Sequence, residues 1–232
     1  MELTMQVIAR IRSDFPCKFG IPRQSGLVPE LRAQVVFEPE FRNPDMLRGL
    51  EGFSHIWLLW NFSGNRKDGW SPTVRPPRLG GNQRMGVFAT RSPFRPNPIG
   101  LSCVKLEQII FQSPAGPVLV VSGADLMDGT PIFDIKPYVP YADCHPDASE
   151  GFTASASDFL LKVYFPPDLM AKIPENRREA LTGVLAHDPR PSYQQDPNRI
   201  YGLTFGGFNV RFRIADNTVT VLDVQPVSSI NI

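Results

Sequence analysis

The chain has 232 residues, of which 42% are hydrophobic and 20% are charged, and its formal net charge is +1. This composition is typical of a globular protein, and the total charge alone predicts neither a nucleic-acid binder nor a membrane-surface protein. Three cysteines far apart in the sequence argue against a disulfide framework, and the most apolar run, IWLLW at 56–60, is too short to cross a membrane. We therefore expect a soluble, cytoplasmic protein.

Short apolar runs separated by turn residues extend to about residue 143. They lie at 5–11, 33–37, 55–62, 86–90, 101–111 and 118–126, and a short helical turn is expected around Asp45 to Leu50. The run at 55–62 is apolar almost throughout, as in a strand buried on both faces. Several short strands with regular turn signals predict an all-β barrel or sandwich.

A segment of small and polar residues at 142–158 is typical of a linker. Beyond it we expect a strand at 159–165, a helix that ends before Pro189, and strands that turn at Ala215–Asn217. Leu181, Val184 and Leu185 have the spacing of one helical face. The prediction is therefore two parts, residues 1–145 and a small α+β unit at 157–232, each with its own core.

The segment TRSPFRPNPIG at 90–100 is unusually rich in proline and arginine. Pro93, Pro96 and Pro98 fix their own backbone and restrict the residue before each of them. The segment is therefore held extended, and it cannot be a central strand because three N–H groups are missing. Such a loop loses little entropy on binding, which suits a preorganised wall of a binding site.

The surroundings of this loop carry one sign of charge. No acidic residue lies between Asp68 and Glu107, whereas six basic residues do, namely Arg75, Arg78, Arg84, Arg91, Arg95 and Lys105. Trp70 and Phe94 lie in the same stretch and could stack on bases. The pattern favours a local binding surface for nucleic acid, and a proline-rich surface loop with solvated arginines is the alternative.

A second candidate segment is DLMDGTPIFDIKPYVPYAD at 125–143. Its Asp128-Gly129 pair predicts a turn, and Asp128, Asp134 and Asp143 could each supply a base, with Tyr138 or Lys136 as a hydrogen-bond donor. A hairpin turn with exposed carboxylates is the alternative. No P-loop sequence occurs, LGGNQRMG opens no helix, and CHPD at 144–147 has no second cluster of ligands, so we expect neither a Rossmann domain nor a metal site.

Three stretches taken together, PRQSG, RPPRLGGNQRMGVFATRSPFRPNPIGLS and DGTPIFDIKPYVPYAD, resemble the TsaA-like family, within it the TrmO-type tRNA methyltransferases. AHDPRPSYQ and FNVRFRI resemble the C-terminal domain of its longer bacterial members. The resemblance implies a single antiparallel β-barrel that binds S-adenosyl-L-methionine, followed by a smaller α+β domain. It also implies methylation of N6 of threonylcarbamoyladenosine at position 37 of threonine tRNAs, by a homodimer. A non-catalytic RNA-binding β-barrel is the alternative function.

Carried onto this chain, the resemblance places the cofactor against Pro22, Arg23, Gln24, Ser63, Gly64, Arg95, Asp128, Gly129, Thr130 and Pro131. Asp134, Tyr138 and Asn97 are the candidate catalytic residues, and the sequence does not decide between Asp134 and Tyr138 as the assisting group. Arg75, Arg78, Arg84 and Arg91 are the candidate RNA-binding residues. After the linker, basic residues alternate with aromatic ones at Arg190, Tyr193, Arg199, Tyr201, Arg211, Phe212 and Arg213, which suits a second contact with tRNA. Because all cofactor motifs precede the linker, a chain that ends near Ser155 is expected to stay folded and to bind the cofactor, but to methylate tRNA far more slowly because it binds RNA more weakly.

Overall fold

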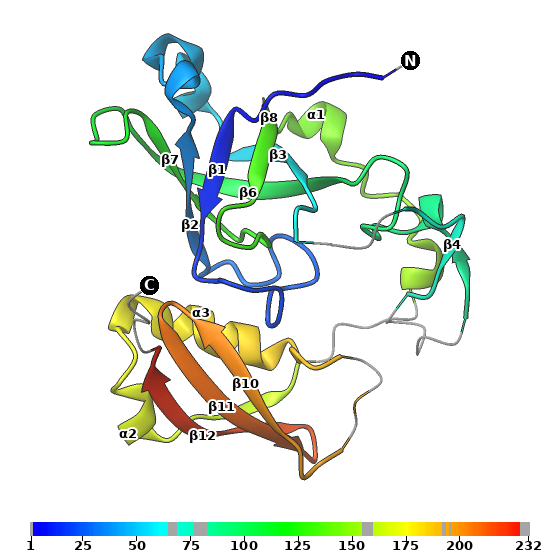
Figure 1. The fold of residues 1–232 in the computed structure, drawn as a ribbon, viewed down its shortest axis with the longest axis vertical. Helices are drawn as coiled ribbons and strands as arrows, with labels where there is room; N and C mark the ends of the chain where they lie inside the picture. Colours follow the sequence, from blue (N-terminus) through cyan, green and yellow to red (C-terminus); the bar gives the residue numbers. More distant parts are fainter. Residues whose placement is uncertain are drawn as a thin grey trace.

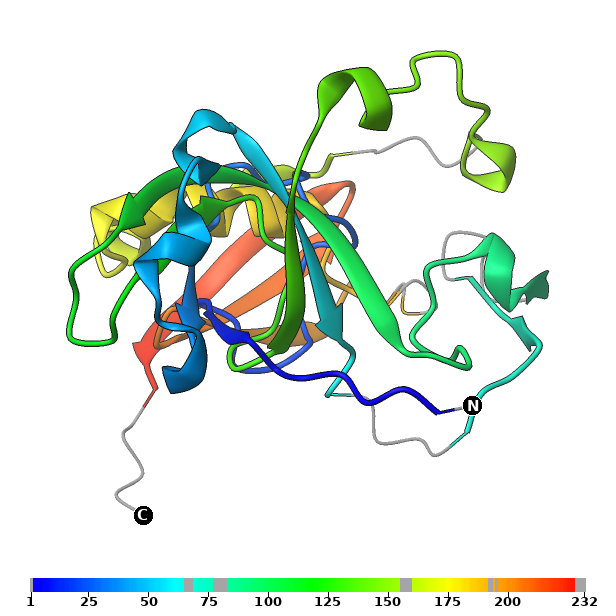
Figure 2. The same ribbon diagram turned by 90° about the horizontal axis from the view of Figure 1, so that it is seen from above.

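The computed structural model describes residues 2–64, 69–76, 83–154, 160–191, 194 and 196–227. Its N-terminal part is a strand-rich barrel, and a helix packed on a sheet forms the C-terminal part below it (Figures 1 and 2). No helix in these ranges is long and apolar enough to cross a membrane.

The N-terminal part is a closed barrel of six strands, which confirms the predicted antiparallel β-barrel. Its neighbours around the barrel are β1 (Ala9–Arg12), β2 (Arg32–Phe37), β7 (Val118–Ser122), β6 (Ile99–Ile110), β3 (His55–Asn61) and β8 (Pro131–Pro137), and β8 pairs back onto β1. Every neighbouring pair is antiparallel. Closure leaves the barrel without a free edge, so its backbone groups are paired within the sheet.

Strand β3 shows how the sequence pattern becomes the barrel core. Ile56, Leu58 and Trp60 point inwards and are buried, whereas the residues between them on the outer face are only partly buried. The prediction of a strand buried on both faces is therefore wrong, because the second face of β3 is the outside of a barrel. The register with β8 shifts between Leu59 and Trp60, which marks a bulge near the end of the strand.

Two segments project from the same side of the barrel (Figures 1 and 2). The first, between β3 and β6, contains β4 (Thr73–Val74), β5 (Met85–Gly86) and the 3-10 turn η5 (Val87–Ala89). The predicted strand at 86–90 is thus mostly a turn. The second follows β8 and contains α1 (Pro140–Asp143) and η6 (Gly151–Thr153). Between β2 and β3, the expected helical turn is present as three 3-10 turns, η1 (Pro39–Phe41), η2 (Pro44–Leu47) and η3 (Leu50–Gly52).

The C-terminal part has the α+β character expected from its sequence. Its sheet has the order β10 (Ile200–Phe205), β11 (Phe208–Ala215), β12 (Thr218–Pro226) and β9 (Lys162–Tyr164), with β9 parallel to β12. Helices α2 (Pro167–Met170) and α3 (Glu175–Ala186) complete it, and Leu181, Val184 and Leu185 are buried as predicted. The hairpin between β11 and β12 turns at Asp216 and Asn217, which both have positive φ.

The segment at 13–31 connects β1 to β2 of the barrel, but it packs into the hydrophobic core of the C-terminal part, which we call the second core. Phe15, Val28 and Leu31 are buried in the same cluster as the α3 and β10–β12 side chains. The His187 ring lies 2.9 Å from the carbonyl of Leu27, and Asp14 forms an ion pair with Arg177 of α3 at 3.0 Å. The two cores therefore share a segment, and independent folding of residues 1–145 and 157–232 stays a prediction.

Candidate functional site

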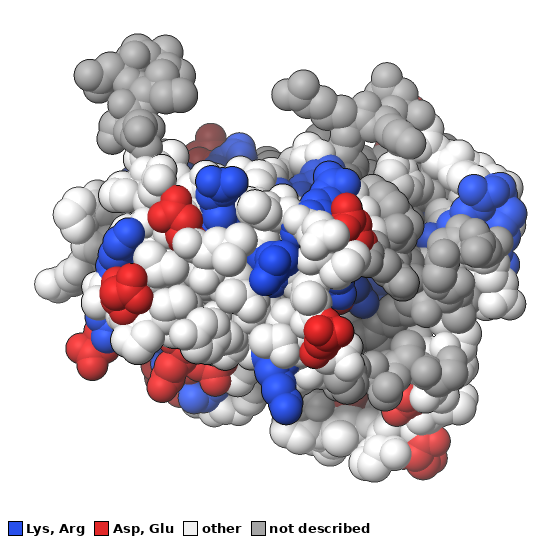
Figure 3. All heavy atoms as spheres, turned by 90° about the horizontal axis from the view of Figure 1, so that it is seen from below, with Lys and Arg blue, Asp and Glu red and all other residues white. Residues whose placement is uncertain are grey.

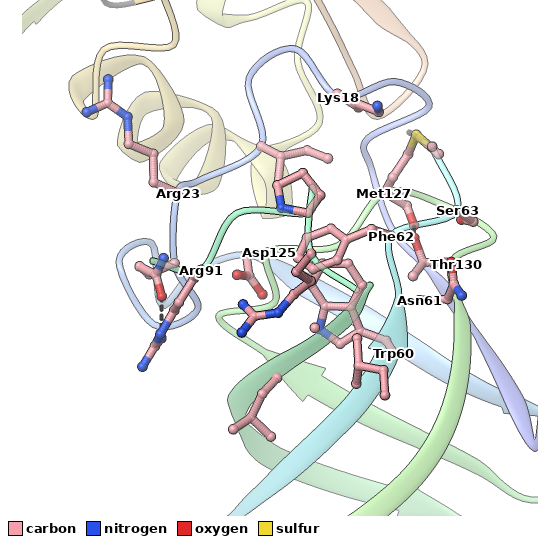
Figure 4. Close-up of a pocket in the computed structure, with 18 of the residues that line it drawn as sticks. Lys18, Arg23, Trp60, Asn61, Phe62, Ser63, Arg91, Asp125, Met127 and Thr130 are labelled. Carbon is pink, nitrogen blue, oxygen red and sulfur yellow. Dashed lines mark hydrogen bonds between the residues drawn. The ribbon is translucent and has the colours of Figure 1, made fainter. Parts of the chain in front are cut away.

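A cavity of about 620 Å³ opens at the end of the barrel that faces the C-terminal part (Figure 4). Four stretches line it: residues 18–24, the end of β3 with residues 61–64, the proline-rich loop continuing into β6, and residues 125–130. This volume suits a ligand of the size of a nucleoside cofactor. Residues far apart in the sequence thus form one binding site.

The floor of the cavity is aromatic. The rings of Trp60 and Phe62 lie 4.4 Å apart between centroids. A Cβ added to Gly100 would lie 2.3 Å from the Trp60 ring, so only glycine permits this packing. The indole N–H of Trp60 donates to the hydroxyl of Ser102 at 2.9 Å, which satisfies its one polar atom.

Cations surround the opening of the cavity. Lys18, Arg23, Arg91 and Arg95 all contribute to its lining. The Arg91 guanidinium donates to the side-chain oxygen of Gln24 (Figure 4), and Arg95 Nη1 donates to the carbonyl oxygen of Thr90 at 3.2 Å. Contacts within the loop thus orient Arg95, and the positive rim suits an anionic group such as a carboxylate or a phosphate.

The cavity also holds a carboxylate that the sequence analysis missed. Asp125 is partly buried, and its Oδ1 accepts a hydrogen bond of 2.6 Å from the Ser102 hydroxyl. Burial raises the pKa of the Asp125 carboxyl above its ordinary value, although the Ser102 hydrogen bond and the charge of Arg91 act in the opposite direction. Asp125 stands three residues before the Asp-Gly turn, and nothing in the local pattern distinguishes it from the other aspartates of that segment.

Seven of the predicted cofactor residues line this cavity, namely Pro22, Arg23, Gln24, Ser63, Gly64, Arg95 and Thr130, and so does Asn97. Asp128, Gly129 and Pro131 are not part of its lining. They form the turn that ties β8 to β1: Asp128 Oδ1 accepts from the backbone N–H of Ser13 at 3.1 Å, and the Gly129 N–H donates to the carbonyl oxygen of Ile11. Besides Asp125, the sequence analysis also missed Lys18, Trp60, Leu101 and Met127 as lining residues.

Asp134 and Tyr138 do not line the cavity. Asp134 forms an ion pair of 2.9 Å with Lys136 at the partly exposed surface of β8. The Tyr138 ring lies 5.8 Å from that of Trp57, at the opposite end of β3 from Trp60. Their catalytic roles stay predictions, and the structure brings Asn97 but neither of these two to the cavity.

A wider cavity of about 1320 Å³ adjoins the first and shares Arg23, Gln24, Thr90, Arg91 and Pro93 with it. Its other lining residues include the exposed rings of Trp70 and Phe88 and two of the predicted RNA-binding arginines, Arg75 and Arg84. The Arg84 Nε donates to the Thr73 hydroxyl at 2.8 Å. Arg78, another predicted RNA-binding residue, lies outside the described residues.

The arginines of the C-terminal part are a mixed set. Arg190 forms a bidentate ion pair with Asp188, with both distances at 2.8 Å, and Arg199 lies over the Tyr201 ring. Arg211 and Arg213 are exposed on β11. Figure 3 shows basic and acidic side chains interspersed on the face that looks downwards in Figure 1, without one dominant sign. Tyr193, which the sequence analysis placed in the same set, lies outside the described residues.

Within the described residues, no cluster of three or more His, Cys, Asp or Glu could hold a metal ion.

The fold is a closed antiparallel β-barrel with a cavity at one end, and the segment between β3 and β6 adds a second cavity lined by arginines and aromatic rings. This class of protein differs from the Rossmann-type enzymes, which have a parallel sheet. The chain belongs to the TrmO family of tRNA methyltransferases. Residues 10–144 match the family's tRNA-methyltransferase O N-terminal domain, and residues 159–227 match the TrmO C-terminal domain.

Individual relatives agree with this assignment. The tRNA (adenine(37)-N6)-methyltransferase of Escherichia coli is 43% identical over 94% of this chain and 96% of its own length. The protein of the same name from Eikenella corrodens is 47% identical over 75% of this chain and 98% of its own. A crystal structure of TrmO from Pseudomonas aeruginosa superposes with a TM-score of 0.77 at 36% identity and covers 97% of this chain and all of that one.

Proposed function

We propose that this protein transfers a methyl group from S-adenosyl-L-methionine to N6 of adenosine 37 in tRNA. The observation that carries the proposal is the pair of adjoining cavities: one has the size and lining for a nucleoside cofactor, and the other has the arginines and exposed rings for RNA. The relatives named tRNA (adenine(37)-N6)-methyltransferase support it, as does a Pseudomonas aeruginosa relative whose name assigns it S-adenosylmethionine-dependent activity.

The first cavity fits the cofactor chemically. Trp60 and Phe62 offer apolar surface to its ring and aliphatic parts, and Arg95 can address its carboxylate. At Gly64 an added Cβ would lie 2.7 Å from the Lys18 side chain and 3.2 Å from that of Met127, so glycine keeps this corner of the cavity open. When bound, S-adenosylmethionine supplies the methyl group from a sulfonium, and the electron pair of the broken carbon–sulfur bond remains on sulfur.

The second cavity fits RNA. Trp70 is 57% exposed and Phe88 is 79% exposed, and both rings line the same cavity, so both are accessible to a partner. Bases can stack on such rings while Arg75, Arg84 and Arg91 meet phosphates. Because the two cavities share Arg91 and Pro93, a nucleotide held in the second can present one atom to the first.

The finer substrate is threonylcarbamoyladenosine in threonine tRNAs, a proposal that depends on the family resemblance. Its N6 is a nitrogen of a ureido group, and the lone pair of this nitrogen is delocalised into the ring and the carbonyl. N6 is therefore a poor nucleophile, and both its positioning and the removal of its proton have to assist the reaction. Asn97 lies at the cavity and can orient such a group. Asp134 and Tyr138 lie outside the cavity, so for either to assist the reaction, bound RNA or a second subunit would have to bring the reacting nitrogen next to it.

We also propose a homodimer in the cytoplasm, where tRNA is modified. Leu101, at the edge of the first cavity, is 51% exposed, and Ile99 beside it on β6 is 36% exposed. A second subunit that covers these side chains would lie next to the site, as the resemblance implies. Sedimentation equilibrium measures the mass, and a monomer at micromolar concentration would contradict this part of the proposal.

The test of the function is nucleoside mass spectrometry. Threonine tRNA that carries threonylcarbamoyladenosine is incubated with the protein and S-adenosylmethionine, and the expected product carries one additional methyl group. Unmodified transcript and a tRNA for another amino acid are the controls for the finer substrate. Calorimetry with the cofactor alone tests the alternative, because a non-catalytic RNA-binding module would bind tRNA without binding S-adenosylmethionine.

A further inference from the structure

Asp125 is the only acidic side chain among the described residues that line the first cavity. Its carboxylate is held by a short relay, in which the Trp60 N–H donates to Ser102 and the Ser102 hydroxyl donates to Asp125 Oδ1. Figure 4 shows Asp125 between Arg91 and the rings of Trp60 and Phe62. A desolvated carboxylate oriented in this way costs stability, so it is expected to have a task.

Methylation of N6 releases a proton, which an acceptor in the cavity has to take up. Lysine and arginine side chains are hydrogen-bond donors without an acceptor site, and hydroxyl and amide side chains are too weakly basic near neutral pH to take up the proton. Asp125 remains as the proton acceptor among the described lining residues. Because burial raises the pKa of this carboxyl, it is a stronger base than an exposed aspartate.

We propose that Asp125 is the general base of the methyl transfer, an inference that rests on the proposed function. N6 uses its lone pair to form the bond to the methyl carbon, the carbon–sulfur pair stays on sulfur, and the N6 proton passes to Asp125 Oδ2, the oxygen that the Ser102 hydroxyl does not bind. Ser102 is a positioning residue, since it holds the other oxygen of the carboxylate and does not meet the substrate.

The groups that face this carboxylate set its basicity. Ser102 approaches from β6, the backbone N–H of Ser25 from the segment at 13–31, and Arg91 from the proline-rich loop, and all three favour the ionised form. Lys18, Arg23 and Arg95 are the other charged side chains of the described lining. Burial outweighs these contributions in the free protein.

The decisive variant is Asp125→Asn, which keeps an acceptor for Ser102 but cannot take up the proton. We expect kcat to fall by about 10²–10⁴-fold, the effect of losing a general base. The affinity for S-adenosylmethionine, measured by calorimetry, should be unchanged. Asp45→Asn is the matched control, because Asp45 lies in η2 at the other end of the barrel (Figure 1).

Ser102→Ala supplies a readout that a purely structural role would not change. The Ser102 hydrogen bond lowers the pKa of Asp125, so its removal should move the acid limb of the pH profile of kcat/KM, which reports the free protein, to higher pH. The carboxyl carbon signal of Asp125, followed by NMR in the free protein, should titrate at higher pH by the same amount. In Asp125→Asn the acid limb should disappear.

Three outcomes would overturn the inference. An Asp125→Asn variant with the kcat of the wild type removes the base. A loss confined to cofactor affinity, with kcat restored at saturating S-adenosylmethionine, makes Asp125 a cofactor anchor instead. An acid limb that Ser102→Ala leaves in place belongs to another group. These three outcomes are measured against an active wild-type protein, so they overturn this inference alone. A wild-type protein that transfers no methyl group would overturn the proposed function as well.

Discussion

Arg95 combines a backbone stiffened by proline with a guanidinium at the cofactor cavity. If Arg95 binds the cofactor carboxylate as proposed, its replacement by alanine removes a charge-assisted hydrogen bond worth about 1.5–3 kcal/mol. We therefore expect the dissociation constant for S-adenosylmethionine to rise by about 10- to 150-fold. Calorimetry measures it, with Arg48→Ala on the distant turn after η2 as the control. Unchanged affinity in a folded Arg95→Ala protein would exclude Arg95 from the cofactor site.

Glu107 is a carboxylate whose role is structural. It accepts a hydrogen bond of 2.7 Å from Ser122 and lies 2.6 Å from Arg32 and 3.2 Å from Lys105, so it joins β6 to β7 and β2 at a bulge. The Ser122 hydrogen bond and, to a smaller extent, Lys105 and Arg32 hold the pKa of Glu107 below its ordinary value. The folded state therefore prefers the ionised form, and this contribution to stability exists above the unfolded-state pKa and is lost as pH falls through the folded-state pKa.

Glu107→Gln should accordingly lower the free energy of unfolding by about 1 kcal/mol at neutral pH. The difference from wild type should shrink as the pH falls below the unfolded-state pKa of glutamate, about 4.3, and vanish in acid below the folded-state pKa, where both states of the wild type are protonated. Urea unfolding at the two pH values measures this, and Glu51→Gln on the exposed turn η3 is the matched control. A deficit of equal size at both pH values would mean that charge is not the cause.

At the scale of elements, the segment between β3 and β6 lines both cavities, and its proposed RNA-binding residues Arg75 and Arg84 belong to the second cavity alone. Arg75 and Arg84 are exposed in the second cavity and absent from the lining of the first. Arg75→Ala and Arg84→Ala should therefore weaken tRNA binding and reduce its salt slope by about 0.7 for each phosphate that the variant no longer neutralises, as for single-stranded RNA. The affinity for S-adenosylmethionine should stay at the wild-type value. Binding isotherms at several salt concentrations measure the slope, and a slope equal to that of wild type would show that these arginines are solvated.

At the scale of the whole molecule, the C-terminal part packs against the segment that forms one wall of the first cavity. Residues 18–24 line the cavity, and on either side of them Phe15 and Val28 are buried in the second core. An added Cβ on Gly183 of α3 would lie 2.7 Å from Val28, which shows how closely the helix meets the segment. These contacts lead to a different prediction for the chain that ends near Ser155, a position just outside the described residues: it should lose cofactor binding, because each exposed core side chain costs about 1.5–3 kcal/mol.

A point variant in the full chain separates this support from general stability. Val28→Ala and Val224→Ala delete the same atoms from the same core, and both should destabilise the protein by about 2 kcal/mol. Only Val28→Ala, on the segment that also lines the cavity, should weaken S-adenosylmethionine binding in the folded protein. Thermal unfolding and calorimetry measure the two effects. Equal cofactor affinity in the two variants would mean that the C-terminal part does not support the wall.

Local signals were sufficient for much of the architecture. Turn residues and short apolar runs predicted five of the six barrel strands but not β8. The 3.6-residue period predicted the buried face of α3, and three long motifs predicted the family. These signals are local because backbone conformation and side-chain alternation depend on neighbours in the chain. Seven of the ten residues that the family resemblance assigns to the cofactor line the first cavity, since the motifs that carry them are contiguous in sequence.

Tertiary structure alone decided which side chains meet in the cavity and how basic they are. Asp125 and Asp134 stand in the same segment and look alike in sequence, yet the folded chain places the first beside Ser102 in the cavity and pairs the second with Lys136 at the surface. The sharing of residues 13–31 between two cores was equally invisible, because it depends on contacts with residues more than a hundred positions away. Burial and long-range contact arise only when the chain is folded, and in this protein they determine both the candidate base and the support of the cofactor wall.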